Sequence, residues 1–87
     1  MHEAGLMRDL MGKILQLAGD TNAVKVTAID VWLGALSHMS PAHFQEHFDH
    51  AASGTLAAGA MIRCEESTDM CDPHADGIFL RGIETEG

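Results

Sequence analysis

Residues 23–34 form a stretch in which apolar and polar side chains alternate and β-branched residues are frequent, a pattern that predicts a β-strand. One face of this strand carries Thr27, Ile29, Val31 and Leu33. The opposite face carries Ala28, Asp30 and Trp32. The first face is apolar except for its threonine, whereas the second carries a charged aspartate. We therefore expect the first face to pack on the helices of the chain.

A segment with helical periodicity precedes this strand. In residues 4–18, Leu6, Leu10 and Ile14 recur at four-residue spacing. Gly19 follows and is suited to end a helix. The segment is therefore predicted to be an amphipathic helix whose apolar stripe faces the core.

A second helix is predicted to begin at Ser40-Pro41. Serine caps the first turn, and proline at the first helical position has no amide hydrogen that would go unpaired. The helix is expected to run to about Ser53, with Gly54 just after its end. Its core stripe consists of Phe44, Phe48 and Ala51.

The remaining apolar segments predict short strands at residues 60–66 and 77–84, together with a very short first strand that carries His2. The element order is then β-α-β-α-β-β. The expected fold class is α+β, a small three- to four-stranded mixed sheet with two helices packed on one face. A chain of 87 residues is expected to form one domain, 1–87.

Thirteen acidic residues against five basic ones give the chain a formal net charge of −8. Nucleic acids and anionic membrane surfaces bind basic patches, so neither is expected as a partner, whereas metal cations and basic proteins fit. We find no transmembrane pattern and no signal-peptide pattern, and therefore expect a cytoplasmic protein. No nucleophile elbow or phosphate-binding loop is present, so an enzyme is not expected.

The chain begins Met1-His2-Glu3, which can chelate a metal ion. The terminal amine of Met1, the backbone nitrogen of His2 and the His2 Nδ1 atom lie within a few bonds of one another. Glu3 can supply a fourth ligand through its backbone nitrogen or its carboxylate. A planar set of such nitrogens favours Ni(II) or Cu(II) over Zn(II). The tripeptide is therefore a candidate metal site.

Three histidines form a second group of potential ligands. His43, His47 and His50 follow one another at spacings of four and three on the second predicted helix, which places them on one stripe. A pair of histidines four residues apart on a helix can chelate a divalent ion. The stripe is either such a metal site or the polar shoulder of an amphipathic helix.

Cys64, Cys71 and His74 lie in or beside an acidic loop predicted at residues 65–76. Their number and spacing differ from those of structural zinc sites, so we expect no structural zinc within one chain. The cysteines are free thiols, ligands of a metal shared between subunits, or a disulfide pair. Trp32, on the far face of the sheet, is either a contact residue or half covered by its neighbours, and a homodimer through this face or the sheet edges is one alternative.

Further motifs occur at defined separations after the N-terminal tripeptide. They are Leu33-Gly34-Ala35-Leu36-Ser37, Gly54-Thr55-Leu56-Ala57 and Arg81-Gly82-Ile83-Glu84. With these motifs, residues 1–63 and 78–84 resemble the HypA/HybF family of nickel-insertion accessory proteins for hydrogenase maturation. Members of that family carry an inserted zinc domain with two C-x2-C pairs. Here Glu65 to Asp76 stand at that place without either pair, so zinc is not expected as a cofactor.

The resemblance implies that Met1, His2 and Glu3 bind Ni(II) transiently for delivery to a nickel enzyme such as a nickel–iron hydrogenase. It also implies two protein partners, a maturation GTPase of the HypB type and the hydrogenase large subunit. Two other functions stay open. One is a HypA-like interaction scaffold that transfers no metal, and the other is a small zinc- or copper-binding protein that uses the helical histidines.

Overall fold

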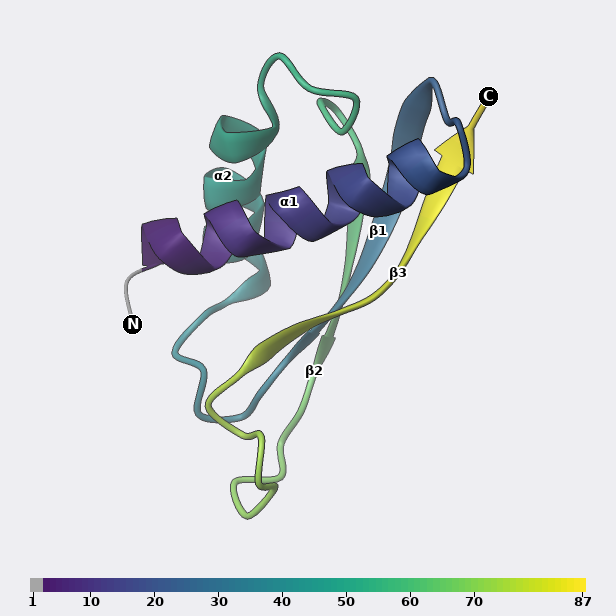
Figure 1. Cartoon of the computed structure of the whole chain (residues 1–87). Coiled ribbons are helices and arrows are strands. Elements are labelled where there is room, and N and C mark those ends of the chain that lie inside the picture. Colours follow the sequence, from purple (N-terminus) through teal and green to yellow (C-terminus); the bar gives the residue numbers. More distant parts are fainter. Residues whose placement is uncertain (1–2) are drawn as a thin grey trace.

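The computed structural model describes residues 3–87, so the first strand predicted to carry His2 lies outside the described residues. The elements follow in the order α1 (Glu3–Asp20), β1 (Lys25–Leu33), α2 (Pro41–Ala52), β2 (Met61–Glu66) and β3 (Ile78–Glu86) (Figure 1). Within residues 3–87 the order is therefore α-β-α-β-β. Every other predicted helix and strand is present, with ends that differ from the prediction by a few residues at most.

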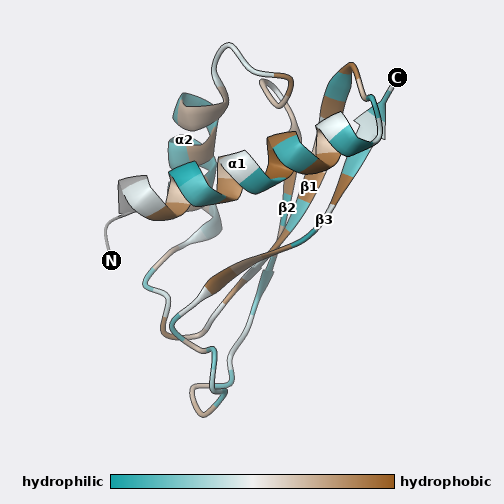
Figure 2. Ribbon diagram, viewed as in Figure 1, coloured by the Kyte–Doolittle hydropathy of each residue, from teal (hydrophilic) through white to brown (hydrophobic). Residues whose placement is uncertain are grey.

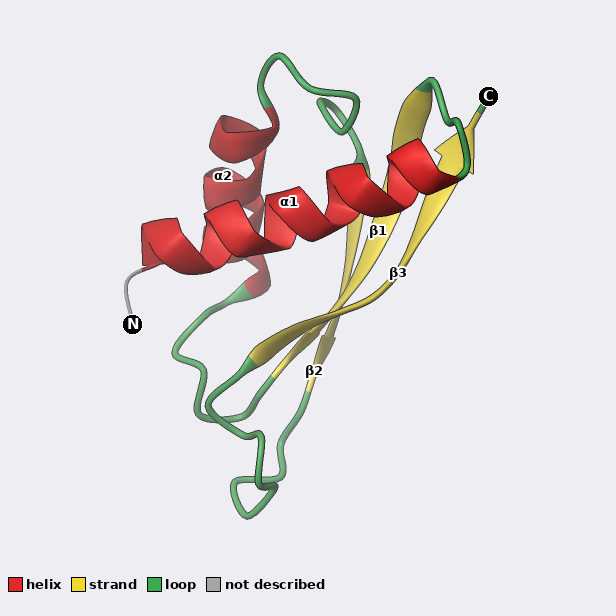
Figure 3. Ribbon diagram, viewed as in Figure 1, coloured by secondary structure: helices red, strands yellow, loops and turns green. Residues whose placement is uncertain are grey.

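β1 is the central strand of a three-stranded mixed sheet with the order β2-β1-β3. β2 runs parallel to β1, in a register that pairs Ala28 with Met61 and Leu33 with Glu66. β3 runs antiparallel to β1 on the other side. Both helices cover the same face of this sheet (Figure 1, Figure 3). The predicted α+β class is confirmed.

The hydrophobic core lies between the two helices and β1. Its largest fully buried side chains are Ile14 of α1, Phe44 and Phe48 of α2, and Val26, Ile29, Val31 and Leu33 of β1. Figure 2 shows hydrophobic positions recurring along α1 and alternating with polar ones along the strands. The predicted stripe of α2 is confirmed at its two phenylalanines, and Ala52 is buried beside them, while Ala51 is only partly buried.

A β-bulge changes which residues of β1 face the core. The register between β1 and β3 shifts between Val26 and Ala28. As a result Val26 is fully buried together with Ile29, whereas Thr27 is half-buried and its hydroxyl donates to the Glu84 carbonyl at 3.2 Å. The prediction that Thr27 shares the core face is wrong, because the bulge interrupts the two-residue alternation.

Local backbone chemistry sets the ends of both helices. Ser40 caps α2 by accepting a hydrogen bond from the His43 amide at 3.1 Å, which confirms the predicted start. Gly54 has a φ of +79° just after the end of α2, as predicted for a residue in the left-handed region. Gly19, in contrast, lies inside α1, and Asn22, with a φ of +56°, takes the left-handed conformation after that helix.

Arg63 of β2 joins all three strands on the solvent-exposed face of the sheet. Its guanidinium donates to the carboxylate of Asp30 on β1 at 2.7 Å and to the carboxylate of Glu84 on β3. The hydrogen bond from Arg63 holds the pKa of Asp30 below its ordinary value. Because these groups are exposed, their ion pairs contribute little to stability.

We expect Phe48→Ala to lower the free energy of unfolding by about 3–5 kcal/mol, because a fully buried ring is replaced by a cavity. Urea denaturation followed by circular dichroism measures the change. Phe79→Ala is a matched control, since Phe79 is 45% exposed and its loss should cost clearly less. Equal costs for the two variants would contradict a core between α2 and the sheet.

Arg63→Met should raise the pKa of Asp30 toward its ordinary value, because the donor that stabilises the charged carboxylate is lost. The folded-state pKa of Asp30 is depressed, so the linked stabilisation is present above the unfolded-state pKa and is lost as the pH falls through the folded-state pKa. NMR titration of the side-chain carboxyl measures the shift. Arg81→Met, which removes the partner of Glu65, should leave Asp30 unchanged. If the pKa of Asp30 were the same in Arg63→Met as in the parent, the pairing of Arg63 with Asp30 would be ruled out.

Candidate metal site

Met1 and His2, two of the three predicted nickel ligands, lie outside the described residues, and Glu3 is the first residue of α1. The first four amide groups of a helix have no carbonyl acceptor within that helix. The backbone nitrogen of Glu3 therefore donates to no carbonyl of α1. It also lies at the positive end of the helix dipole, which favours an anionic ligand such as a deprotonated amide. The tripeptide site itself stays a prediction.

α2 brings two of its three histidines together. His43 and His47 lie one helical turn apart, with their Nε2 atoms 2.8 Å from each other and their ring centroids 4.6 Å apart. At this separation one imidazole donates a hydrogen bond and the other accepts it. The next histidine, His50, lines a cavity between α2 and α1.

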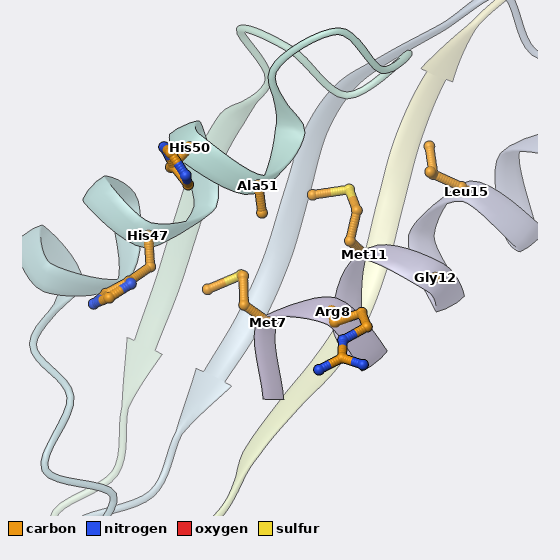
Figure 4. Close-up of a pocket in the computed structure, with 8 residues that line it drawn as sticks. All are labelled: Met7, Arg8, Met11, Gly12, Leu15, His47, His50 and Ala51. Carbon is orange, nitrogen blue, oxygen red and sulfur yellow. The ribbon is translucent and has the colours of Figure 1, made fainter. Parts of the chain in front are cut away.

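This cavity between the helices has a volume of about 450 Å³. It is lined by Met7, Arg8, Met11, Gly12, Leu15, His47, His50 and Ala51 (Figure 4). In Figure 4 the thioether side chains of Met7 and Met11 extend from α1 toward α2, where His47 and His50 lie. The sequence did not predict this cavity, because the α1 residues that face α2 depend on how the two helices cross.

The connection between β2 and β3 begins after Glu66. β2 ends at Glu66, as predicted for the strand at residues 60–66, so the first two residues of the acidic segment predicted at 65–76 lie in the strand and the loop itself starts at Ser67. Cys64 is half-buried within β2, and its burial, followed by the charge of Glu66, raises the pKa of its thiol. Cys71 is exposed in the loop, and both cysteines are free thiols, so they do not form the disulfide that was one alternative.

Short-range hydrogen bonds organise this loop, which extends from the end of the sheet away from the helices (Figure 3). The carboxylates of Asp69 and Asp72 accept hydrogen bonds from the amides of Cys71 and His74 at 2.9 and 2.7 Å. Among the described residues, no group of three or more histidine, cysteine, aspartate or glutamate side chains is arranged to hold a metal ion. Neither predicted trio thus forms a three-ligand site in that part of the chain.

Trp32 packs against Phe79, its cross-strand neighbour on β3. Their ring centroids are 5.7 Å apart, and the His74 ring meets Phe79 edge-on at 5.5 Å. Asp72 and Arg81 complete the lining of a cavity of about 410 Å³ beside these rings. Trp32 is half-buried by these neighbours. The homodimer through this face stays a prediction.

Comparison with known proteins identifies the family. Residues 1–73 match the model of a family described as hydrogenase/urease nickel incorporation, metallochaperone, HypA. The chain belongs to the HypA family. The resemblance predicted from the sequence is confirmed.

Two curated HypA proteins are similar to part of this chain. Hydrogenase maturation factor HypA of Pelodictyon phaeoclathratiforme is 32% identical over 66 residues, which cover 76% of this chain and 56% of that protein. Hydrogenase maturation factor HypA 2 of Bradyrhizobium diazoefficiens is 33% identical over 67 residues, which cover 77% and 59%. The chain thus spans less than two thirds of the length of these relatives.

Solved HypA structures share the fold. The solution structure of the Ni metallochaperone HypA from Helicobacter pylori superimposes with a TM-score of 0.78 at 16% identity, covering 99% of this chain and 98% of that one. A second solution structure of a HypA protein gives a TM-score of 0.76 at 15% identity, with coverages of 98% and 96%. Within residues 3–87, no helix of this HypA-family chain is long and apolar enough to cross a membrane.

We expect one chain to hold no tightly bound structural zinc, because a closed tetrahedral site needs four protein ligands and no three converge in the described residues. Elemental analysis of freshly purified protein after dialysis against EDTA measures the zinc content. A protein with both Cys64→Ser and Cys71→Ser should melt at the same temperature as the parent. One zinc ion per chain that resists the chelator would overturn this expectation.

Proposed function

We propose that this HypA-family chain binds Ni(II) at Met1-His2-Glu3 and delivers it during the maturation of a nickel enzyme. The observation that carries the proposal is that the family match begins at Met1 and so includes the tripeptide. The curated relatives are named hydrogenase maturation factors, which supports a hydrogenase as the recipient. The role we assign is binding and transfer of a metal ion, without catalysis.

The proposed coordination is planar and rich in nitrogen. The ligands are the Met1 amine, the backbone nitrogen and Nδ1 of His2, and Glu3 through its backbone nitrogen or its carboxylate. Such a set suits the tetragonal geometry that Ni(II) and Cu(II) prefer. The donors have to be deprotonated before they bind, so the affinity falls as the solution becomes more acidic.

The start of α1 supports this coordination in two ways. The Glu3 amide lies in the first turn, where no intrahelical carbonyl competes for its hydrogen. One turn later Met7 is buried in the core, so the helix that follows the tripeptide is held firmly. All the ligands are neighbours in sequence, and metal loading therefore requires no rearrangement of the sheet or of α2.

Transfer requires partners that take up or accept the ion. We propose a maturation GTPase of the HypB type and a hydrogenase large subunit in these roles. The net charge of −8 supports attraction of metal cations and of basic protein surfaces. We place the protein in the cytoplasm, where the thiols of Cys64 and Cys71 stay reduced, and we propose that Ni(II) is bound only transiently.

We expect His2→Ala to remove most of the Ni(II) affinity and to leave the melting temperature nearly unchanged, because the role proposed for His2 is to supply ligand atoms. Calorimetric titration of protein with a native Met1 measures the affinity, and the absorbance spectrum shows whether the coordination of the bound ion is planar. His38→Ala, at an exposed histidine, is the control. Nickel binding by His2→Ala equal to that of the parent would refute the tripeptide site.

A second variant removes the same site without changing any of its residues. Two residues added before Met1 move the free amine away from His2. A single added residue would be unsuitable, because His2 would then be third in the chain, where amine, amides and imidazole again form a planar chelate. The extended protein should lose the planar nickel spectrum. A scaffold that transfers no metal would show no such spectrum even before the extension.

A further inference from the structure

His43 and His47 are already as close together as two ligands of one metal ion. Their Nε2 atoms are 2.8 Å apart. A metal–imidazole bond is about 2.0–2.1 Å long, so an ion bonded to both nitrogens would have an N–metal–N angle of about 86°. The same construction places the ring centroids about 4.3 Å apart, close to the observed 4.6 Å. Small rotations of the two rings therefore convert the hydrogen-bonded pair into a chelate.

We propose that His43 and His47 form a second, bidentate metal site for Cu(II) or Ni(II). An angle near 90° separates neighbouring ligands in tetragonal complexes of these ions, and nitrogen ligands bind Cu(II) more tightly than Zn(II). Water or another ligand completes the coordination, so the site is open. It uses none of the atoms of Met1-His2-Glu3 and goes beyond the proposed function.

The core of the protein holds both histidines in place. Phe44 and Phe48 directly follow His43 and His47, are fully buried, and fix the same two turns of α2. The Ser40 cap fixes the start of the helix at the His43 amide. The positions of both imidazoles on α2 are therefore set before a metal ion binds, which lowers the entropic cost of binding.

Two electrostatic effects on a cation bound at the pair oppose each other. Arg8 of α1 lines the same cavity as His47, and its positive charge opposes a bound cation. The net charge of the whole chain, −8, acts in the opposite direction. Met7 also lines this cavity, one turn after the first residue of α1 (Figure 4). His47 thus lies across the cavity from the first turns of α1.

The test uses the full chain with His2→Gln, which disables the tripeptide and leaves the pair. Calorimetry measures Cu(II) and Ni(II) affinity, and electron paramagnetic resonance of Cu(II) counts the bound nitrogens. We expect a Cu(II) spectrum with splitting from two imidazole nitrogens, and weaker binding of Zn(II) than of Cu(II). His43→Gln or His47→Gln in this background should each weaken Cu(II) binding about tenfold or more, since two metal–imidazole bonds become one.

His50→Gln is the matched control, because it removes a histidine from the same helix but not from the pair. It should leave the Cu(II) affinity unchanged, and circular dichroism checks that every variant folds. An equal loss with His50→Gln, Zn(II) binding tighter than Cu(II), or a doubly substituted His43→Gln and His47→Gln protein that binds Cu(II) like its background would each overturn the proposal.

The two proposed sites can fail separately. Equal Ni(II) affinities of the parent and of His2→Gln would refute the tripeptide site alone. The effect of removing His43 and His47 is measured with the tripeptide disabled, so that effect decides the second site by itself.

Discussion

The burial of Phe44 and Phe48 determines what α2 presents to the rest of the molecule. β1 is paired on both edges, so the chain can build its core only over the faces of the sheet, and both helices cover one of them. A helix turns by about 100° per residue, so the residue before each buried phenylalanine lies about a quarter-turn around the axis. His43 and His47 occupy those two positions, one turn apart. The same packing that closes the core therefore sets the two imidazoles side by side.

Features that depend on neighbouring residues could be predicted from the sequence. The start of α2 follows from the serine cap and the proline at its first position, and Gly54 lies where a left-handed residue ends the helix. Features that depend on pairing with a distant strand could not be predicted from the sequence. The bulge that buries Val26 in place of Thr27 exists only because β3 pairs with β1 in a shifted register.

The candidate sites also differ in whether they depend on neighbouring residues or on residues distant in the sequence. The tripeptide chelate is local in sequence, so its chemistry could be proposed from three residues, and the family match supports it. The histidine stripe could be predicted from the spacings of four and three residues, but these spacings did not show which of the three histidines would contact one another. In the structure the rings of His43 and His47 meet, and His47 also lines the cavity together with His50. The cavity itself combines residues about forty positions apart, which no local pattern reveals.

A metal carrier has to hold its ion tightly and still give it up, and the two proposed sites differ in the property that decides this. Amide and amine nitrogens around a planar ion leave no in-plane position open, so release requires an entering ligand. Two imidazoles leave most coordination positions open, and they are provided by a helix that the core holds rigid. His47 lies across a shared cavity from Met7, one turn after the residue that starts α1. An ion bound to the two imidazoles beside this cavity would exchange its remaining ligands one at a time, whereas the planar tripeptide chelate would release its ion only after another ligand enters.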